Sequence, residues 1–185
     1  MSAAAVASEP RAGAELDFES LYRDNFTFVV RSARRLGVES AWIDDVAQEV
    51  FVVAARRLAE FEGRAKVRTW LFSITSRVVQ GHRRWAGRHN RRRDALAREP
   101  STIDDPYPRA QAADTLISLL QELSEQHRTV FILGELEGMT AAEIGVGLGL
   151  NPNTTYSRLR EARRKMAAAV QRHRAREARE GSPQR

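Results

Sequence analysis

The chain contains no cysteine, no apolar run long enough to cross a membrane and no alternating β-branched runs. Without cysteine, a disulfide framework and a zinc site with cysteine ligands are both excluded. A membrane-spanning helix needs about 18 consecutive apolar residues, and the sequence has no such run. The first residues lack a basic stretch followed by an apolar core, so they are not a secretory signal. We therefore expect an all-α, cytoplasmic protein that is not inserted in a membrane.

Acidic residues are missing from one stretch, between Glu62 and Asp94. The whole chain has 30 Lys and Arg against 24 Asp and Glu, a formal net charge of +6. Ten of those cations fall in this one stretch, with aromatic residues between them. Such a concentrated positive field is typical of a surface that binds a nucleic-acid backbone. A solvated basic face is the simpler interpretation of shorter charge runs.

Residues 137–166 have the pattern of two short helices joined by a glycine turn. Thr140 and Glu143 have the spacing of a capping box, in which each side chain bonds the backbone N–H of the other residue. After the glycines, Asn151 offers an N-cap and Pro152 occupies the first helical position. One face of the second helix is apolar and should be buried, through Thr155, Leu159, Ala162 and Met166. This pattern predicts a DNA-binding helix-turn-helix, and an ordinary helical hairpin with solvated arginines is the alternative.

Changes in composition divide the chain into segments. We expect a disordered N-terminus at 1–15, a helical domain at 16–93, a flexible linker at 94–111, a second helical domain at 112–170 and a charged tail at 171–185 that frays. The linker prediction rests on clustered prolines and acids. The fold class is therefore two small all-α domains joined by a linker, with the helix-turn-helix in the second. No internal repeat is present.

The first domain carries a polar helical face and a basic loop. Asp45, Gln48 and Glu49 fall on one side of a helix, which suits a basic partner helix and equally suits a merely solubilising face. The loop that begins at Gly63 could hold a phosphate, or a base drawn out of its stack. Among the aromatics, Trp70 is expected to be structural, whereas Trp85 stands among arginines and is a candidate for contact with DNA.

Four segments resemble the extracytoplasmic-function sigma factors of bacterial RNA polymerase. The first domain has DDVAQEVF at 44–51 and FEGRAKVRTWLFSI at 61–74, similar to the second conserved region of that family. The second domain has LSEQHRTVFILGELEGMTAAEIG at 123–145 and LGLNPNTTYSRLREAR at 148–163, similar to its fourth region. Two matches in the right order across a linker are more specific than a helix-turn-helix alone.

The resemblance implies a signal-responsive promoter-specificity subunit without catalytic residues, metal or cofactor. The clamp coiled coil of core RNA polymerase would be bound by Asp45, Gln48 and Glu49, and the polymerase flap by the second domain. The promoter −10 element would be read and melted by Phe61, Arg64, Lys66, Arg68, Trp70, Arg77, Gln80, Arg83 and Arg84. The −35 element would be read by Asn153, Thr154, Tyr156, Ser157, Arg158, Arg160, Glu161 and Arg164. An anti-sigma factor is a further partner that such proteins often have.

Four positions depart from the family pattern. Arg77 stands where asparagine is usual and Gly81 where aspartate is usual, so the capture of a flipped −10 base would differ in detail. Gly145 replaces alanine, which weakens a helix by about 1 kcal/mol. Glu161 replaces arginine, and a carboxylate accepts from cytosine N4 instead of donating to guanine. We therefore predict an altered −35 preference.

Two other classes of function compete with this interpretation. An autonomous regulator would bind duplex DNA without polymerase, but it would have no use for the polar face and basic loop of the first domain. An enzyme acting on nucleic acid could use Asp44, Asp45 and Glu49 as magnesium ligands, yet no second carboxylate cluster completes a site. The histidines are scattered among basic or polar neighbours, at His82, His89, His127 and His173.

Overall fold

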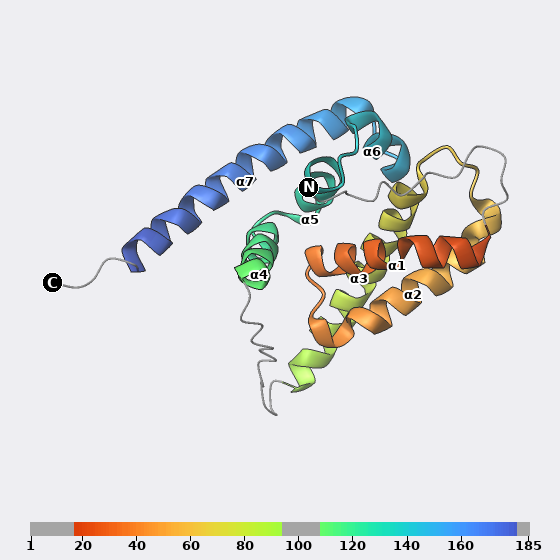
Figure 1. Cartoon of the computed structure of the whole chain (residues 1–185), viewed down its shortest axis with the longest axis horizontal. Coiled ribbons are helices and arrows are strands. Elements are labelled where there is room, and N and C mark those ends of the chain that lie inside the picture. The colour runs from red at the N-terminus through yellow and green to blue at the C-terminus, as the bar shows by residue number, and fades with distance from the viewer. Residues whose placement is uncertain (1–16, 94–107, 181–185) are drawn as a thin grey trace.

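The structure, a computed structural model, describes residues 17–93 and 108–180 and contains helices but no strand within those ranges (Figure 1). This arrangement in two helical regions confirms the predicted all-α fold. None of the helices described is both long enough and apolar enough to cross a membrane. The expected disordered N-terminus at 1–15 lies outside the described residues, as do positions 94–107 of the expected linker and 181–185 of the tail.

The first region is a three-helix unit with two short 3₁₀ segments. In chain order it comprises α1 (Phe18–Arg35), η1 (Ser40–Trp42), α2 (Ile43–Arg57), η2 (Leu58–Glu60) and α3 (Val67–Arg93). Asp17 caps α1, because its carboxylate accepts a 2.9 Å hydrogen bond from the Ser20 backbone N–H. The apolar stripes of the three helices meet in a core that includes Leu21, Val29, Val46, Val50, Phe72 and Ile74.

The second region comprises α4 (Pro108–Gln121), α5 (Glu125–Phe131), the π-helical segment η3 (Ile132–Leu136), α6 (Ala141–Leu148) and α7 (Pro152–Glu180). Helix α4 begins within the segment expected to be linker. Helix α7 continues beyond residue 170, where we expected a frayed tail. Where the extension begins, Ala169 is fully buried and Arg172 forms an ion pair with Glu122, just after α4. Beyond Arg172 the described residues of the extension are almost all exposed.

Arg128 of α5 is a buried cation that closes the end of α4. Its side chain is only 5% exposed. The guanidinium donates to the backbone carbonyl oxygens of Leu120 at 2.7 Å, Gln121 at 3.2 Å and Leu123 at 3.0 Å. The Leu120 carbonyl also accepts from the Leu123 N–H at 3.2 Å, and the guanidinium supplies a further donor to the acceptors at the end of the helix. It also donates to the Leu36 carbonyl of the first region at 3.2 Å.

The two regions pack directly against each other, which the sequence did not predict. Their buried apolar residues form one continuous cluster, with α6 against the start of α3 and α4 against α1. Figure 1 shows this contact, and it shows the C-terminal half of α7 pointing away from the first region. The packing between the regions therefore also fixes how the two surfaces expected to bind DNA lie relative to each other.

Candidate nucleic-acid and polymerase interfaces

Helices α6 and α7 form the predicted helix-turn-helix. The Thr140 N–H donates to Glu143 Oε2 at 2.8 Å, and the Glu143 N–H donates to Thr140 Oγ1 at 3.3 Å, which completes the capping box. Gly149 ends α6 in the left-handed conformation, with φ of 64°. Asn151 then starts α7, because its Oδ1 accepts a 2.9 Å hydrogen bond from the Asn153 N–H.

The turn of this motif explains one departure from the family pattern. A Cβ atom at Gly145 would lie 3.2 Å from the Leu150 carbonyl oxygen and 3.2 Å from Thr155 Oγ1. Those contacts are tighter than ordinary van der Waals distance, so glycine lets α6 and α7 approach closely. Gly145 therefore lowers the helix propensity of α6 but allows α6 and α7 to pack more closely.

The outer face of α7 presents polar and aromatic groups to solvent. Asn153, Tyr156, Ser157, Arg160 and Arg164 are exposed, whereas Thr154, Arg158 and Glu161 are half-buried. Tyr156 stands out, because a side chain of its size is 61% exposed. The opposite face buries Thr155, Leu159, Ala162 and Met166, as the helical spacing predicted. The helix thus has the two-sided character that insertion into a major groove requires.

Glu161 is already engaged by neighbouring cations. Its two carboxylate oxygens accept from Arg164 Nε at 2.9 Å and Nη2 at 2.7 Å, and Lys165 Nζ lies 3.8 Å away. The Arg164 hydrogen bond is the largest of the effects that lower the pKa of Glu161 to about 2. The carboxylate therefore orients Arg164 on the surface of α7, so it is not a free acceptor for cytosine.

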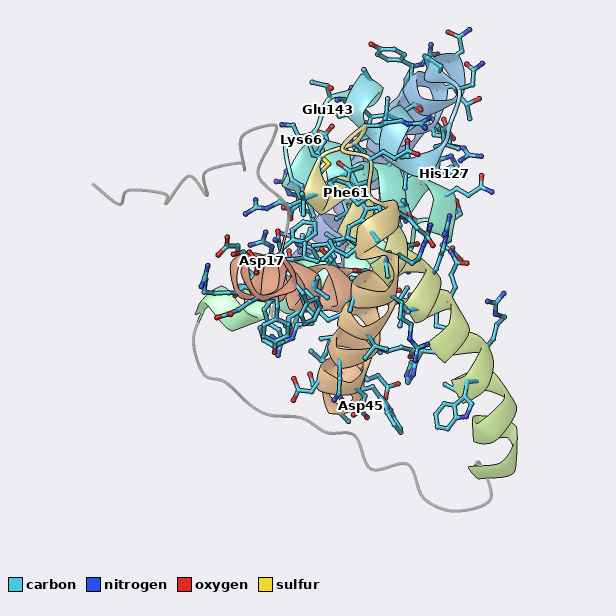
Figure 2. All side chains as sticks on the ribbon, turned by 90° about the vertical axis from the view of Figure 1, so that its right-hand side faces the viewer. Asp17, Asp45, Phe61, Lys66, His127 and Glu143 are labelled. Carbon is cyan, nitrogen blue, oxygen red and sulfur yellow. The ribbon has the colours of Figure 1, made fainter. Side chains whose placement is uncertain are left out.

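The cations of the basic loop also have partners. Arg64 forms an ion pair with the adjacent Glu62, and Arg68 Cζ lies 5.6 Å from the centre of the Phe28 ring. Lys66 Nζ reaches across to Glu143 Oε1 at 3.1 Å. Figure 2 shows these last two residues side by side where the regions meet. Hydrogen bonds from the Thr140 backbone and from Lys66 lower the pKa of Glu143, so the pair stays charged at neutral pH.

The remaining residues expected at the −10 element divide into two sets. Arg77 and Arg84 are exposed and lie on one face of α3, seven residues apart. Gln80 and Arg83, by contrast, are half-buried against the second region. Gln80 donates to the Glu125 carboxylate, and Arg83 donates to the Leu36 carbonyl and, at 3.3 Å, to Gln121 Oε1.

Two aromatic clusters flank these cations. The Phe61 and Trp70 ring centroids are 5.0 Å apart, which joins the loop to the first turn of α3. Further along α3, the ring centroids of His82 and Trp85 are 5.3 Å and 5.5 Å from that of Trp42. Trp85 is 39% exposed, so part of its ring faces solvent beside Arg84. The sequence indicated Trp85, but not its packing against Trp42.

Asp45, Gln48 and Glu49 are exposed on α2, as the helical spacing predicted. Two of them, Asp45 and Gln48, line an open groove of about 600 Å³ between α1 and α2. Its apolar lining comes from both helices and includes Phe18, Tyr22, Phe26, Phe51 and Val52. Phe18 and Tyr22 are 40% and 43% exposed, which is unusual for large apolar side chains at helical spacing. The sequence showed their four-residue spacing, which we read only as an amphipathic helix.

The histidine side chains that the structure describes contact neighbouring residues of the chain. His127 Nδ1 lies 2.7 Å from Ser124 Oγ and 3.3 Å from Lys165 Nζ, and its pKa is lowered by burial and then by that lysine. His173 pairs with Glu177 on the surface of α7, and the side chain of His89 is outside the described part. Within the residues that the structure describes, no three His, Asp or Glu side chains gather where they could hold a metal ion.

Comparison with known proteins identifies the family. The Sigma-70 region 2 family matches residues 21–89, and the Sigma-70, region 4 family matches residues 113–166. The RNA polymerase sigma-H factor of Pseudomonas aeruginosa is 30% identical over 139 residues, which cover 69% of this chain and 72% of that protein. The RNA polymerase sigma factor NccH of Alcaligenes xylosoxydans xylosoxydans is 27% identical over 174 residues, which cover 90% of this chain and 94% of that protein.

A solved structure shares the fold. The sigma factor RpoE from Bartonella quintana, in complex with the anti-sigma factor NepR, aligns with a TM-score of 0.67 and 22% identity, covering 84% of this chain and 97% of that one. The chain therefore belongs to the RNA polymerase sigma factors, and among them to the extracytoplasmic-function type. This confirms the resemblance seen in the sequence and the role in transcription initiation that it implied.

Proposed function

We propose that this sigma factor divides its contacts among three surfaces, one for core RNA polymerase and two for promoter DNA. The observation that carries the proposal is the match to regions 2 and 4 in sequence order, combined with an exposed polar surface in each region. The chain supplies binding free energy for locating and opening a promoter, and the polymerase performs the chemistry. It is thus a non-enzymatic subunit that acts in the cytoplasm, where the polymerase works.

The polymerase-binding surface is the groove between α1 and α2 together with the polar face of α2. Asp45, Gln48 and Glu49 supply acceptors for a basic helix, while Tyr22 and Phe51 provide an apolar floor, with ring centroids 4.7 Å apart. An aromatic groove with a charged rim is the usual composition of a protein interface with a strong central contact. The second polymerase contact, to the flap, falls to the second region.

The −10 surface is the basic loop with the exposed side of α3. Phe61 and Trp70 pack with their ring planes tilted by 45°, near Arg64, Lys66 and Arg68 in the sequence, which suits a single strand whose bases leave the duplex. Along α3, Arg77 and Arg84 contact the phosphate backbone of the DNA. Gln80 and Arg83 also contact it once their hydrogen bonds to the second region are broken.

The −35 surface is the outer face of α7. Its N-terminal residues Asn153, Tyr156 and Arg160 reach base edges in the major groove, while Ser157, Thr154 and Arg158 bind phosphates. Glu161 fixes the position of Arg164 through two hydrogen bonds. This pair would determine part of the −35 preference, in place of the arginine that is usual at position 161 in the family.

An anti-sigma factor completes the proposed set of partners. The Bartonella quintana relative was solved with such a protein, and this chain has the same two-region fold. The signal that releases the chain would then act on that partner.

Run-off transcription with core RNA polymerase on a promoter library tests the proposal. We expect specific transcripts only when the chain is present, and sequencing them defines both promoter elements. The matched control is the Asp45→Lys variant, which keeps both DNA surfaces. Tight, specific binding of the free chain to duplex DNA without any stimulated transcript would instead indicate an autonomous regulator.

A further inference from the structure

Three polar side chains meet where α7 passes the start of α5. His127 Nδ1 lies 2.7 Å from Ser124 Oγ and 3.3 Å from Lys165 Nζ. Ser124 is exposed, and the other two side chains are half-buried. We call Ser124, His127 and Lys165 the edge cluster. None of the three belongs to the polymerase-binding surface or to the two DNA-binding surfaces of the proposed function.

The edge cluster borders the proposed −35 surface. At about 3.6 residues per turn, Arg158, Glu161 and Lys165 share one flank of α7, because they are spaced by three and four residues. All three side chains on this flank are half-buried, whereas Arg160 and Arg164 on the outer face are exposed. Helix α5 packs against α7, and the contact between Lys165 and the start of α5 places the cluster on this flank.

The flank of a recognition helix faces the DNA backbone. The major groove is about 12 Å wide and a helix with its side chains is about 10–12 Å across, so an inserted helix fills the groove from wall to wall. Residues on its outer face then meet base edges, while residues on its flanks meet the sugar–phosphate walls. The edge cluster is therefore placed to meet a phosphate group of the DNA and not a base.

The edge cluster can offer three hydrogen-bond donors to such a phosphate. The Lys165 ammonium is only a donor, so its contact with His127 requires the lone pair of Nδ1. The ring hydrogen is then on Nε2, and the Ser124 hydroxyl donates to the same Nδ1 atom. If Nδ1 takes up a proton, it becomes a donor itself, and both Ser124 and Lys165 can turn to a phosphate oxygen.

The charged groups around His127 keep its ring neutral in the free chain. Those that face the ring belong to α7, where Lys165 and Arg158 disfavour a charged imidazole and Glu161 favours it. Burial first, and then Lys165, lowers the pKa of His127 below its usual value. A phosphate reverses this balance, because a negative charge beside the ring stabilises the imidazolium.

We propose that the edge cluster is a phosphate clamp for the −35 duplex, in which Ser124, Lys165 and a protonated His127 hold one phosphate of the DNA backbone. This inference rests on the proposed function, because it requires α7 to enter the −35 major groove. Nδ1 takes one proton from solvent when the clamp closes. A backbone phosphate is the same in every sequence, so the clamp raises the affinity for −35 DNA and leaves the sequence preference unchanged.

The affinity of the holoenzyme for a −35 duplex, measured at about pH 6 and about pH 8, tests the clamp. The duplex carries the −35 element that run-off transcription defines, and both buffers contain the same salt and no free phosphate. The test variant is His127→Gln, which cannot take up the proton. The matched control is His173→Gln, which removes a histidine that pairs with Glu177 further along α7.

We expect the natural chain to bind at least about threefold more tightly at the lower pH, relative to the same ratio for His127→Gln, because one proton is taken up. The pKa of the ring is higher in the complex, so affinity is gained as the pH falls through that value and lost as the pH rises. His173→Gln should keep this dependence. Equal pH dependence in the natural chain and in His127→Gln would overturn the clamp.

The failure of the proposed function has a different signature. If the holoenzyme bound the −35 duplex at neither pH, the proposed −35 surface would be wrong. If it bound the duplex with the same pH dependence in all three chains, only the clamp would be wrong.

Neutralising the DNA backbone identifies the phosphate. A methylphosphonate linkage removes one negative charge, and it is placed at each position of the −35 duplex in turn. We expect one position at which it abolishes the pH dependence of the natural chain and has little effect on His127→Gln. Survival of the full pH dependence at every position would overturn the clamp.

A third measurement does not depend on the folding of His127→Gln. Lys165→Gln should reduce the slope of log affinity against log salt concentration by about 1, because one phosphate contact is lost. Arg174→Gln removes an exposed cation further along α7 and should leave the slope unchanged. Equal slopes for Lys165→Gln and the natural chain would show that Lys165 does not bind a phosphate.

Discussion

The two regions differ in how the polar groups of their proposed DNA-binding surfaces are held. In the second region, the partners are local, since Glu161 orients Arg164 within α7 and Arg163 pairs with Glu135 of the neighbouring η3 segment. In the first region, Arg64 pairs locally with Glu62, but other partners lie across the junction. Lys66 is held by Glu143, and Gln80 is held by Glu125.

This difference has a consequence for the order of binding. The outer face of α7 is preorganised and open to solvent, so it needs no rearrangement to meet a major groove. In the proposed −10 surface, Lys66, Gln80 and Arg83 would exchange partners in the second region for DNA. Arg64, Arg77 and Arg84 are already exposed to solvent.

The largest expected effect comes from Arg128, whose loss would weaken the packing that both regions share. Arg128→Met keeps much of the side-chain volume but leaves three buried carbonyl oxygens and one partly buried one without this donor. We expect the free energy of unfolding to fall by about 3 kcal/mol or more, measured by chemical denaturation. Arg172→Met, which removes only the exposed pair with Glu122, should cost less than about 1 kcal/mol. Equal losses in the two variants would contradict this role of Arg128.

Removing an exposed arginine from α7 should affect the second region alone. Arg160→Ala should weaken discrimination at one position of the −35 element by about 1–3 kcal/mol and leave the −10 preference unchanged. Transcription on libraries that vary each element separately measures this. Arg174→Ala, an exposed cation further along α7, is the control and should leave both preferences intact. A change in −10 preference in Arg160→Ala would break the proposed division.

Reversing a charge at the groove should affect polymerase binding without changing promoter choice. We expect Asp45→Lys to weaken binding to core polymerase about tenfold, or about 1.4 kcal/mol, because a basic partner helix would meet a like charge. The affinity is measured with labelled chain and core enzyme. Glu39→Lys, an exposed charge reversal just before η1, serves as the control. Identical affinities for these two variants would exclude this surface as the polymerase site.

The smallest expected effect concerns Glu161. Glu161→Gln should free Arg164 and change the relative use of −35 sequences by less than about tenfold, or about 1.4 kcal/mol. Because the hydrogen bond from Arg164 lowers the pKa of Glu161 to about 2, the carboxylate is charged around neutral pH and loses its charge only as the pH falls toward that value. The −35 preference of the natural chain should therefore be constant between about pH 5 and 8. An unchanged preference in Glu161→Gln would show that the pair does not contribute.

Features set by neighbours in the chain could be predicted from the sequence. The capping box of Thr140 and Glu143, the N-cap at Asn151 and the buried stripe of α7 all depend on spacings of two to four residues. The exposed face of Asp45, Gln48 and Glu49 followed from the same periodicity. The residue roles assigned from the family resemblance remain predictions.

Features set by residues far apart in the chain could not be predicted. Thr69 and Met139 meet across 70 positions, and no periodic pattern marks either as an interface residue. No pattern in the sequence marks Arg128 as buried, because only the tertiary structure places the carbonyls at the end of α4 around it. The glycines of α6 suggested a weak helix, whereas Gly145 and Gly147 allow two separate close approaches. The structural roles of these residues arise from contacts between parts of the chain that are far apart in the sequence.

The most direct test compares Asp45→Lys and Arg160→Ala with the natural chain, in run-off transcription on one library that varies both promoter elements. The account predicts that Asp45→Lys lowers all transcripts alike and leaves both sequence preferences unchanged, whereas Arg160→Ala changes the −35 preference only. If both variants lowered transcription equally across every promoter without altering either preference, the proposed separation of polymerase and promoter surfaces would be wrong.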